Sequence, residues 1–292
     1  MPTIRTDLAQ EAHGYWQETA AQRGALQGVT VWTETIEGFP VEGMDITHPA
    51  GEKALGKSMG RYWTLDATAL WQHDAKIFEQ LATAIGTLIA PFLPLEGVVL
   101  TAGLGNRDMT PDALGPLTLE HLLVTRHLQL PAFRPVAAAG CGVLGTTGME
   151  TAEWLGGLVK TVSPAAVILV DALAARGINH LCNTVQISNA GLTPGSGVGN
   201  MRKSLQQETL GIPVISVGVP TVVDSVTLAR DLLAAADDDT EPPLLGQQGR
   251  HLFVTPDKID GQVRDMAKLL GYGINLALQP SVTVADITAL LT

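Results

Sequence analysis

The chain has 292 residues, of which 46% are hydrophobic, 16% are charged and only 4% are aromatic. Its formal net charge of −11 and the absence of a basic stripe argue against direct nucleic-acid binding. Two cysteines make no disulfide framework, no secretory signal is recognisable, and Pro91, Pro94 and Glu96 interrupt the most apolar window, which excludes a membrane span there. We therefore expect a cytoplasmic globular protein with a large aliphatic core.

The order of predicted elements indicates an α/β fold. Strands are expected at 29–36, 41–46 and 61–67, pairing as an antiparallel N-terminal extension, and a helix at 74–90. Apolar runs at 97–102, 134–139, 166–170, 185–187 and 213–217 then alternate with helices, which is typical of a mostly parallel sheet flanked by helices. A surface connection is expected at 237–243, and a last helix after residue 255. No domain boundary is evident.

The segment 103–116 carries the first candidate site residue. The strand at 97–102 leads into Gly103 and Gly105, where the backbone can turn sharply. Thr110, Pro111 and Asp112 have the features of a helix start, and we expect that helix to reach about residue 127. Asp112 is therefore expected at the carboxyl edge of the sheet, where open α/β sheets place their sites.

Asp171 has the same setting, since it closes the strand at 166–170 before an expected helix at 172–176. If the two strands are parallel in one sheet, Asp112 and Asp171 emerge at one edge. Paired carboxylates can activate water, because an ionised one takes a proton while a neutral one donates to a carbonyl oxygen. The alternative is that each aspartate only caps a helix.

Other chemistries find weaker support in the sequence. The glycines at 103–105 and 195–199 could cradle phosphate, but they complete neither a dinucleotide fingerprint nor a P-loop, and Ser196 lacks a nucleophile elbow. Cys141 is expected to be a small apolar filler rather than a nucleophile. The seven histidines show no metal-ligand spacing, so we expect no cofactor, although the sequence leaves open a metal between Asp112 and Asp171.

Motifs spread over the whole chain resemble one known family in their order. They lie at 5–9, 103–106, 110–116, 124–127, 147–151, 171–176, 194–200, 208–214, 218–224 and 254–256. Together they closely resemble the germination proteases, spore endopeptidases that degrade small acid-soluble spore proteins. The resemblance implies an atypical aspartic-type peptidase with an α/β core similar to that of hydrogenase-maturation proteases. The family's two proposed catalytic aspartates fall on Asp112 and Asp171.

The resemblance also implies cleavage after Glu or Asp and before an apolar residue followed by Ala. It implies a homotetramer in the spore core, made as a zymogen that clips its own N-terminus. Asp7, Leu8 and Ala9 form such a cleavage site within this chain. We therefore predict self-cleavage between Asp7 and Leu8, with 1–7 as prosequence and 8–292 as a single peptidase domain. Asp7 is also expected to cap the first helix.

Recognition of an acidic residue requires a cation, for which Arg176 and Arg202 (with its neighbour Lys203) are the candidates. Gly195, Ser196 and Gly197, in the glycine segment 195–199, are candidates to offer backbone N–H donors to the substrate or to the oxyanion. Two alternatives stay open, namely a non-catalytic metal- or peptide-binding protein and a nucleoside phosphorylase-like transferase on a similar sheet. A requirement for phosphate would favour the transferase.

Overall fold

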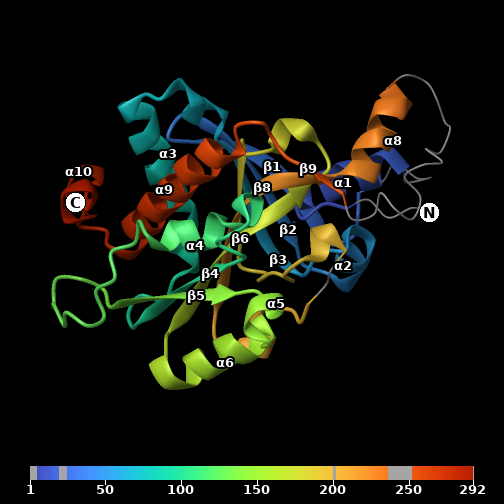
Figure 1. Cartoon of the computed structure of the whole chain (residues 1–292). Coiled ribbons are helices and arrows are strands. Elements are labelled where there is room, and N and C mark those ends of the chain that lie inside the picture. Colours follow the sequence, from blue (N-terminus) through green and yellow to red (C-terminus); the bar gives the residue numbers. More distant parts are fainter. Residues whose placement is uncertain (1–4, 20–24, 200–201, 236–251, 292) are drawn as a thin grey trace.

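The computed structural model describes residues 5–19, 25–199, 202–235 and 252–291. Within these ranges, nine strands form one sheet in the order β1-β2-β3-β7-β8-β6-β4-β5, with β9 paired to β8 (Figure 1). The strands are β1 Val29–Ile36, β2 Phe39–Ile46, β3 Gly60–Asp66, β4 Val99–Leu104, β5 Val136–Gly142, β6 Ala166–Ala175, β7 Thr184–Ser188, β8 Val214–Asp224 and β9 Phe253–Val254.

Helices cover both faces of the sheet, which confirms the predicted α/β class (Figure 1). The α-helices are α1 Ala9–Thr19, α2 Pro49–Leu55, α3 Ala75–Ile89, α4 Leu114–Leu119, α5 Leu144–Thr147, α6 Thr151–Val162, α7 Gln207–Leu210, α8 Ser225–Ala235, α9 Ile259–Leu278 and α10 Val284–Leu291. Short 3-10 turns are η1 Thr68–Gln72, η2 Ala90–Phe92, η3 Thr110–Asp112, η4 Ile178–His180 and η5 Ser196–Val198. In the described part of the chain, no helix is both long and apolar enough to cross a membrane.

The parallel half of the sheet consists of β5, β4, β6 and β8. Residues of β6 alternate between the two faces: Ile168 and Val170 pack in the core below α3, α4 and α9, whereas Val167 and Leu169 pack in the core below α6. β4 and β6 are parallel, as the shared-edge prediction requires, and Gly103 near the carboxyl end of β4 pairs with Val170, the residue before Asp171.

The antiparallel half is larger than the predicted extension. Strands β1, β2 and β3 pair antiparallel as expected, and β7 joins them because it runs antiparallel to both β3 and β8. The alternation of strands and helices in the sequence predicts β7 as one of the parallel strands, and this prediction is wrong. Only residues 176–183 separate β6 from β7, which is too short for a parallel crossover of a dozen or more residues.

One predicted helix is absent, and another is shorter than predicted. Residues 172–175 continue β6, because Ala174 and Ala175 pair with β8, and this pairing overrides the helical preference of the alanines. The helix after Asp112 ends at Leu119 because the following backbone finds other partners: Leu123 N donates to Asn275 Oδ1 at 2.9 Å. The predicted connection at 237–243 lies outside the described residues.

Candidate active site

Asp112 is positioned by direct contact between the backbones of β4 and the segment that opens α4. Gly105 has φ +103°, and a Cβ atom there would lie 2.0 Å from the carbonyl oxygen of Asp112. A Cβ atom on Gly103 would lie 2.5 Å from the carbonyl oxygen of Gly115, and one on Gly115 would lie 2.3 Å from that of Leu104. Only glycine permits this approach at the three positions, so the main chain itself fixes where Asp112 sits.

Hydrogen bonds hold the Asp112 turn in place. The backbone N–H of Asn106 donates to Asp112 Oδ2 at 2.7 Å, and Thr221 Oγ1 donates to the carbonyl oxygen of Pro111 at 2.6 Å. Burial raises the pKa of the Asp112 carboxyl above its ordinary value, while the hydrogen bond from Asn106 opposes that shift. Asp112 is therefore a rigid carboxyl that holds its proton more strongly than a surface aspartate does.

Asp171 lies within β6, so the expectation that it closes the strand is wrong, and so is the alternative that it caps a helix. Its side chain is 8% exposed, and the backbone N–H of Ala172 donates to its Oδ1 at 3.0 Å. Burial raises the pKa of Asp171 well above the ordinary value, and the negative charges of Asp112 and Asp7 raise it further. When the charge of one carboxylate disfavours ionisation of its neighbour, the pair can keep one carboxyl neutral while the other is ionised.

The two aspartates face one cavity of about 390 Å³, which Asp7 also lines. Gly195 and Arg202 line this cavity as well, while Met109 and Phe253 contribute apolar surface to it. A second cavity of about 140 Å³ is lined by Asp7, Asp171 and Ser196 together with Lys57 and Gln186. The fold therefore brings residues from widely separated parts of the sequence to the two aspartates.

The N-terminal segment is docked against β6 beside the aspartates. The Asp7 N–H donates to the carbonyl oxygen of Ala174 at 2.8 Å, and the N–H of Ala174 donates to Asp7 Oδ2 at 2.9 Å. Ser196 Oγ donates to Asp7 Oδ1 at 2.5 Å, and a Cβ atom on Gly197 would lie 2.2 Å from Asp7 Oδ2. The Asp7 carboxylate is thus bonded to β6 and the glycine segment rather than to the first turn of α1.

Leu8, the next residue, is completely buried. It packs in a small cluster with Leu173, Ala175, Leu181 and Val223. The Asp7–Leu8 peptide bond consequently lies between an acidic side chain that lines the aspartate cavity and an apolar side chain in a closed pocket. This is the bond at which the sequence predicts self-cleavage.

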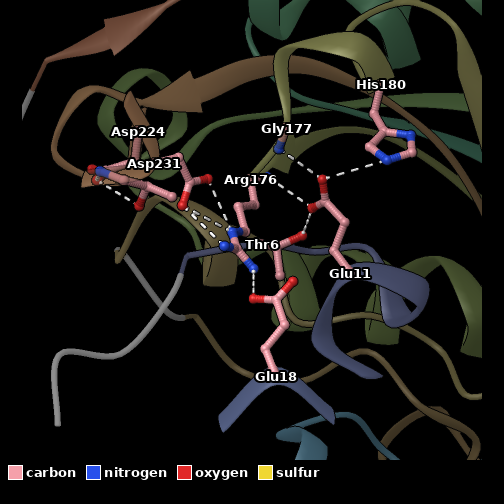
Figure 2. Close-up of polar contacts among 9 residues, drawn as sticks. Thr6, Glu11, Glu18, Arg176, Gly177, His180, Asp224 and Asp231 are labelled. Atoms are coloured by element: carbon pink, nitrogen blue, oxygen red, sulfur yellow. Dashed lines mark hydrogen bonds and ion pairs between the residues drawn. The ribbon is translucent and has the colours of Figure 1, made fainter. Parts of the chain in front are cut away.

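Arg176 lies at the end of β6 in a network of carboxylates (Figure 2). Its guanidinium donates to Asp231 and to Glu18, each at 2.9 Å, and so links α8 to α1. Its backbone N–H donates to Glu11 Oε2 at 2.7 Å. Arg202, in contrast, lines the larger cavity, and its nearest approach to the Glu150 carboxylate is 3.8 Å.

Two polar residues near Asp7 are not indicated by any sequence motif. Lys57 is half-buried and donates from Nζ to the carbonyl oxygen of Thr6 at 2.9 Å. Burial lowers the pKa of the Lys57 ammonium, while the charges of Asp7 and Glu11 oppose this shift. Gln186, on β7, contacts the backbone on both sides of the Asp7–Leu8 bond. Only the tertiary fold brings either residue to the site, so no local pattern could identify them.

The remaining candidates have no visible catalytic arrangement. Cys141 is buried, and burial together with the charge of Asp171 raises the pKa of its thiol to about 12, which keeps it protonated and unreactive. Among the residues that the structure describes, no group of three or more His, Cys, Asp or Glu side chains is arranged to hold a metal ion. The aspartate pair is therefore the arrangement with the clearest chemistry.

A family model and full-length relatives point to one family. The family model described as germination protease matches residues 6–235. The germination protease of Caldanaerobacter subterraneus subsp. tengcongensis is 40% identical over 99% of this chain and 98% of its own, and that of Clostridium acetobutylicum is 38% identical over 98% of each. A [NiFe] hydrogenase maturation protease, HycI from Thermococcus kodakarensis KOD1, is 18% identical, covering 65% of this chain and 97% of its own, with a TM-score of only 0.37. The full-length matches and the family model together show that this chain belongs to the germination protease family of endopeptidases.

Proposed function

We propose that the chain hydrolyses peptide bonds by an aspartic-type mechanism in which Asp112 and Asp171 share one proton. The ionised carboxylate takes a proton from the attacking water, and the neutral carboxyl donates its proton to the substrate carbonyl. The observation that carries this proposal is the shared cavity of the two aspartates, whose pKa values are both raised. The proposed reaction uses no cofactor, and its test includes a chelator.

The proposed specificity is cleavage after Glu or Asp and before an apolar residue followed by Ala. The chain's own Asp7-Leu8-Ala9 segment has this order and lies beside the aspartates, which supports cleavage of the Asp7–Leu8 bond. The chain would then be a zymogen that removes residues 1–7 and retains 8–292 as the peptidase domain. We propose small acid-soluble spore proteins in the spore core as its substrates, and a homotetramer as its assembly.

A peptide with a Thr-Glu-Ile-Ala core tests this function. We expect the protein to cleave it between Glu and Ile, with or without a chelator, and to acquire Leu8 as its own N-terminal residue at mildly acidic pH. Mass spectrometry identifies both products, and a Thr-Gln-Ile-Ala peptide is the matched control. Binding without cleavage would support the non-catalytic alternative, a phosphate requirement would support the transferase, and loss of activity with chelator would indicate a metal-held water.

Lys57 is proposed to supply positive charge for recognition of the acidic residue. It shares the smaller cavity with Asp7, whereas the Arg176 guanidinium is already paired with two carboxylates. We expect Lys57→Met to reduce the preference for the Glu peptide over the Gln peptide about tenfold, as loss of one charged contact does. Comparison of kcat/KM for the two peptides measures this ratio.

Arg176→Ala and Arg202→Ala are the matched comparisons for Lys57→Met. Arg202 lines the larger cavity, so its removal is expected to weaken the preference to a smaller extent. Arg176→Ala is expected to lower the melting temperature while leaving the ratio of the two peptides nearly unchanged, because Arg176 links α1 and α8. A Lys57→Met protein with the wild-type ratio would contradict the assignment.

A further inference from the structure

Gln186 and Asp171 lie on one rung of the sheet, two strands apart. Gly218 of β8 pairs with Asp171 of β6 on one side and with Gln186 of β7 on the other. Residues that pair directly across strands point to the same face of the sheet. The side chains of Asp171 and Gln186 therefore project from one face, and Gly218, which lies between them, has no side chain there. All three residues line the cavity of about 140 Å³. A Cβ atom on Gly218 would lie 2.7 Å from Leu173 Cγ, so the missing side chain leaves room for Leu173 beside the buried carboxyl and the buried amide.

The Gln186 amide holds both sides of the peptide bond between Asp7 and Leu8. Its Nε2 donates to the carbonyl oxygen of Asp7 at 3.1 Å, and its Oε1 accepts from the N–H of Ala9 at 2.7 Å. The side chain is only 8% exposed, so these contacts satisfy an amide that water reaches poorly. The atom that Nε2 contacts is the carbonyl oxygen of the bond proposed to be cut.

We propose that Gln186 is a catalytic residue of this peptidase, whose amide N–H stabilises the negative charge that develops on the scissile carbonyl oxygen. The inference rests on the proposed function, because it takes the Asp7–Leu8 segment as a substrate bound in place. A preorganised donor aimed at a developing oxyanion, in a site that excludes water, is among the strongest contributions an enzyme can make.

The reaction at this bond balances with the two aspartates and water. The water oxygen bonds to the Asp7 carbonyl carbon, one water proton passes to the ionised aspartate, and the carbonyl oxygen takes the proton of the neutral one while Gln186 donates to it. The C–N bond then breaks, and its electron pair goes to the Leu8 nitrogen. This nitrogen takes a proton from the aspartate that had accepted the water proton. The second aspartate regains a proton from the hydroxyl on carbon, which leaves a carboxylic acid and an amine.

Gln279 is a matched control in the same chain. It is buried on the far side of the fold, where its Oε1 accepts from the N–H of Arg134 at 2.9 Å and its Nε2 donates to the Arg134 carbonyl oxygen at 2.9 Å. Gln279 thus makes the same pair of backbone contacts without any peptidase site beside it. A role limited to tethering backbone would give the two glutamines similar effects when they are substituted.

The test compares Gln186→Glu, Gln186→Met and Gln279→Glu in the full chain. Gln186→Met loses both contacts without adding charge, while Gln186→Glu keeps an acceptor for Ala9 N–H and loses the donor to the Asp7 carbonyl at pH values where the new carboxyl is ionised. The first-order rate at which Leu8 becomes N-terminal is followed by mass spectrometry across pH, alongside thermal unfolding. We expect both Gln186 variants to lose about 10²- to 10³-fold in rate. Gln186→Met should retain the wild-type pH profile, and Gln279→Glu should affect only the melting temperature.

Three other results would contradict either the role of Gln186 or the proposed function. If wild type cleaves itself and Gln186→Met does so at the same rate, Gln186 is not the donor, although the peptidase assignment stands. If wild type hydrolyses the Thr-Glu-Ile-Ala peptide but never the Asp7–Leu8 bond, the segment is not a bound substrate and the inference fails. If wild type cleaves neither, and Asp171→Asn behaves identically, the proposed function itself fails.

Discussion

Asp171→Asn and Asp112→Asn should each reduce peptide hydrolysis by about 10³-fold or more, because each removes one half of the proposed proton-sharing pair. Asn has the shape of Asp but neither accepts nor donates the proton that the mechanism requires. The double variant should be no slower than the single ones, since residues that act as a unit show non-additive losses. The measurement is kcat for the Thr-Glu-Ile-Ala peptide at matched concentrations of folded protein.

Asp108→Asn is the control for these substitutions. Asp108 is exposed in the same turn that carries Asp112, and its loss should leave kcat unchanged. Full activity in either Asp112→Asn or Asp171→Asn would show that the chemistry belongs to other residues. Equal losses in Asp108→Asn and Asp112→Asn would indicate a disturbed turn rather than a missing catalytic carboxyl.

The same Asp171→Asn change should stabilise the folded protein at neutral pH. Because the pKa of Asp171 is raised on folding, the native state binds more protons than the unfolded state between the ordinary carboxyl pKa and the raised one. Wild-type stability therefore rises as pH falls through that window, whereas the Asn variant lacks this dependence. Thermal unfolding should give a higher melting temperature for the variant at pH 7 and a gap that closes towards pH 4.

Activity should follow a bell-shaped pH profile, because the pair must carry one proton between its two carboxyls. Since burial raises the pKa of both Asp112 and Asp171, the alkaline limb should lie above the range of an ordinary carboxyl. Deprotonation of the second carboxyl then removes the donor to the substrate carbonyl. A profile of kcat against pH that rises steadily through neutrality would contradict this assignment.

Gly105→Ala should be the most damaging substitution of a residue that contributes no functional group. The new methyl group would lie 2.0 Å from the Asp112 carbonyl oxygen and 2.9 Å from its Oδ1, in a backbone conformation with φ +103°. Relief requires the Asp112 turn to move, so we expect kcat to fall about 100-fold and stability to fall by roughly 1–3 kcal/mol. Hydrolysis of the peptide and thermal unfolding measure the two effects.

Gly156→Ala is the comparison for this experiment. Gly156 lies within α6, and a Cβ atom there would meet nothing within 4 Å. Alanine should therefore stabilise the helix by about 0.5–1 kcal/mol and leave kcat unaltered. Wild-type kinetics in Gly105→Ala would mean that the position of Asp112 does not depend on the close approach of the two backbones.

Short apolar runs in the sequence correctly predict the buried parallel strands β4 and β6, although the polar residue after a run does not always mark the end of the strand. The sequence predicts that Asp112 and Asp171 share one edge if their strands are parallel in one sheet, and the structure shows that β4 and β6 are parallel neighbours. It does not predict that β6 continues past Asp171, because that extension depends on pairing with β8. Local composition at 172–175 favours a helix, and only the partner strand decides against it.

The contacts around the N-terminal segment were also beyond sequence reasoning. Asp7 has the sequence setting of a helix cap, yet its carboxylate accepts hydrogen bonds from Ala174 and Ser196. These partners are separated from Asp7 along the chain by 167 and 189 positions respectively. Lys57 and Gln186 acquire their importance from the same docking and belong to no motif. Periodicity reveals which face of an element is buried, but it does not identify the element that covers that face.

The contact between β4 and the start of α4 has a consequence for how this enzyme tolerates change. Main-chain atoms at Gly103, Gly105 and Gly115 fix the position of the Asp112 turn against the sheet. Changes in the size of the surrounding aliphatic side chains should therefore have little effect on the position of that turn. Substitutions in the core between α3 and α9 should alter how many molecules are folded while leaving the turnover of each folded molecule intact. Substitutions in this fold can thus change the amount of folded protein and the catalytic rate independently of each other.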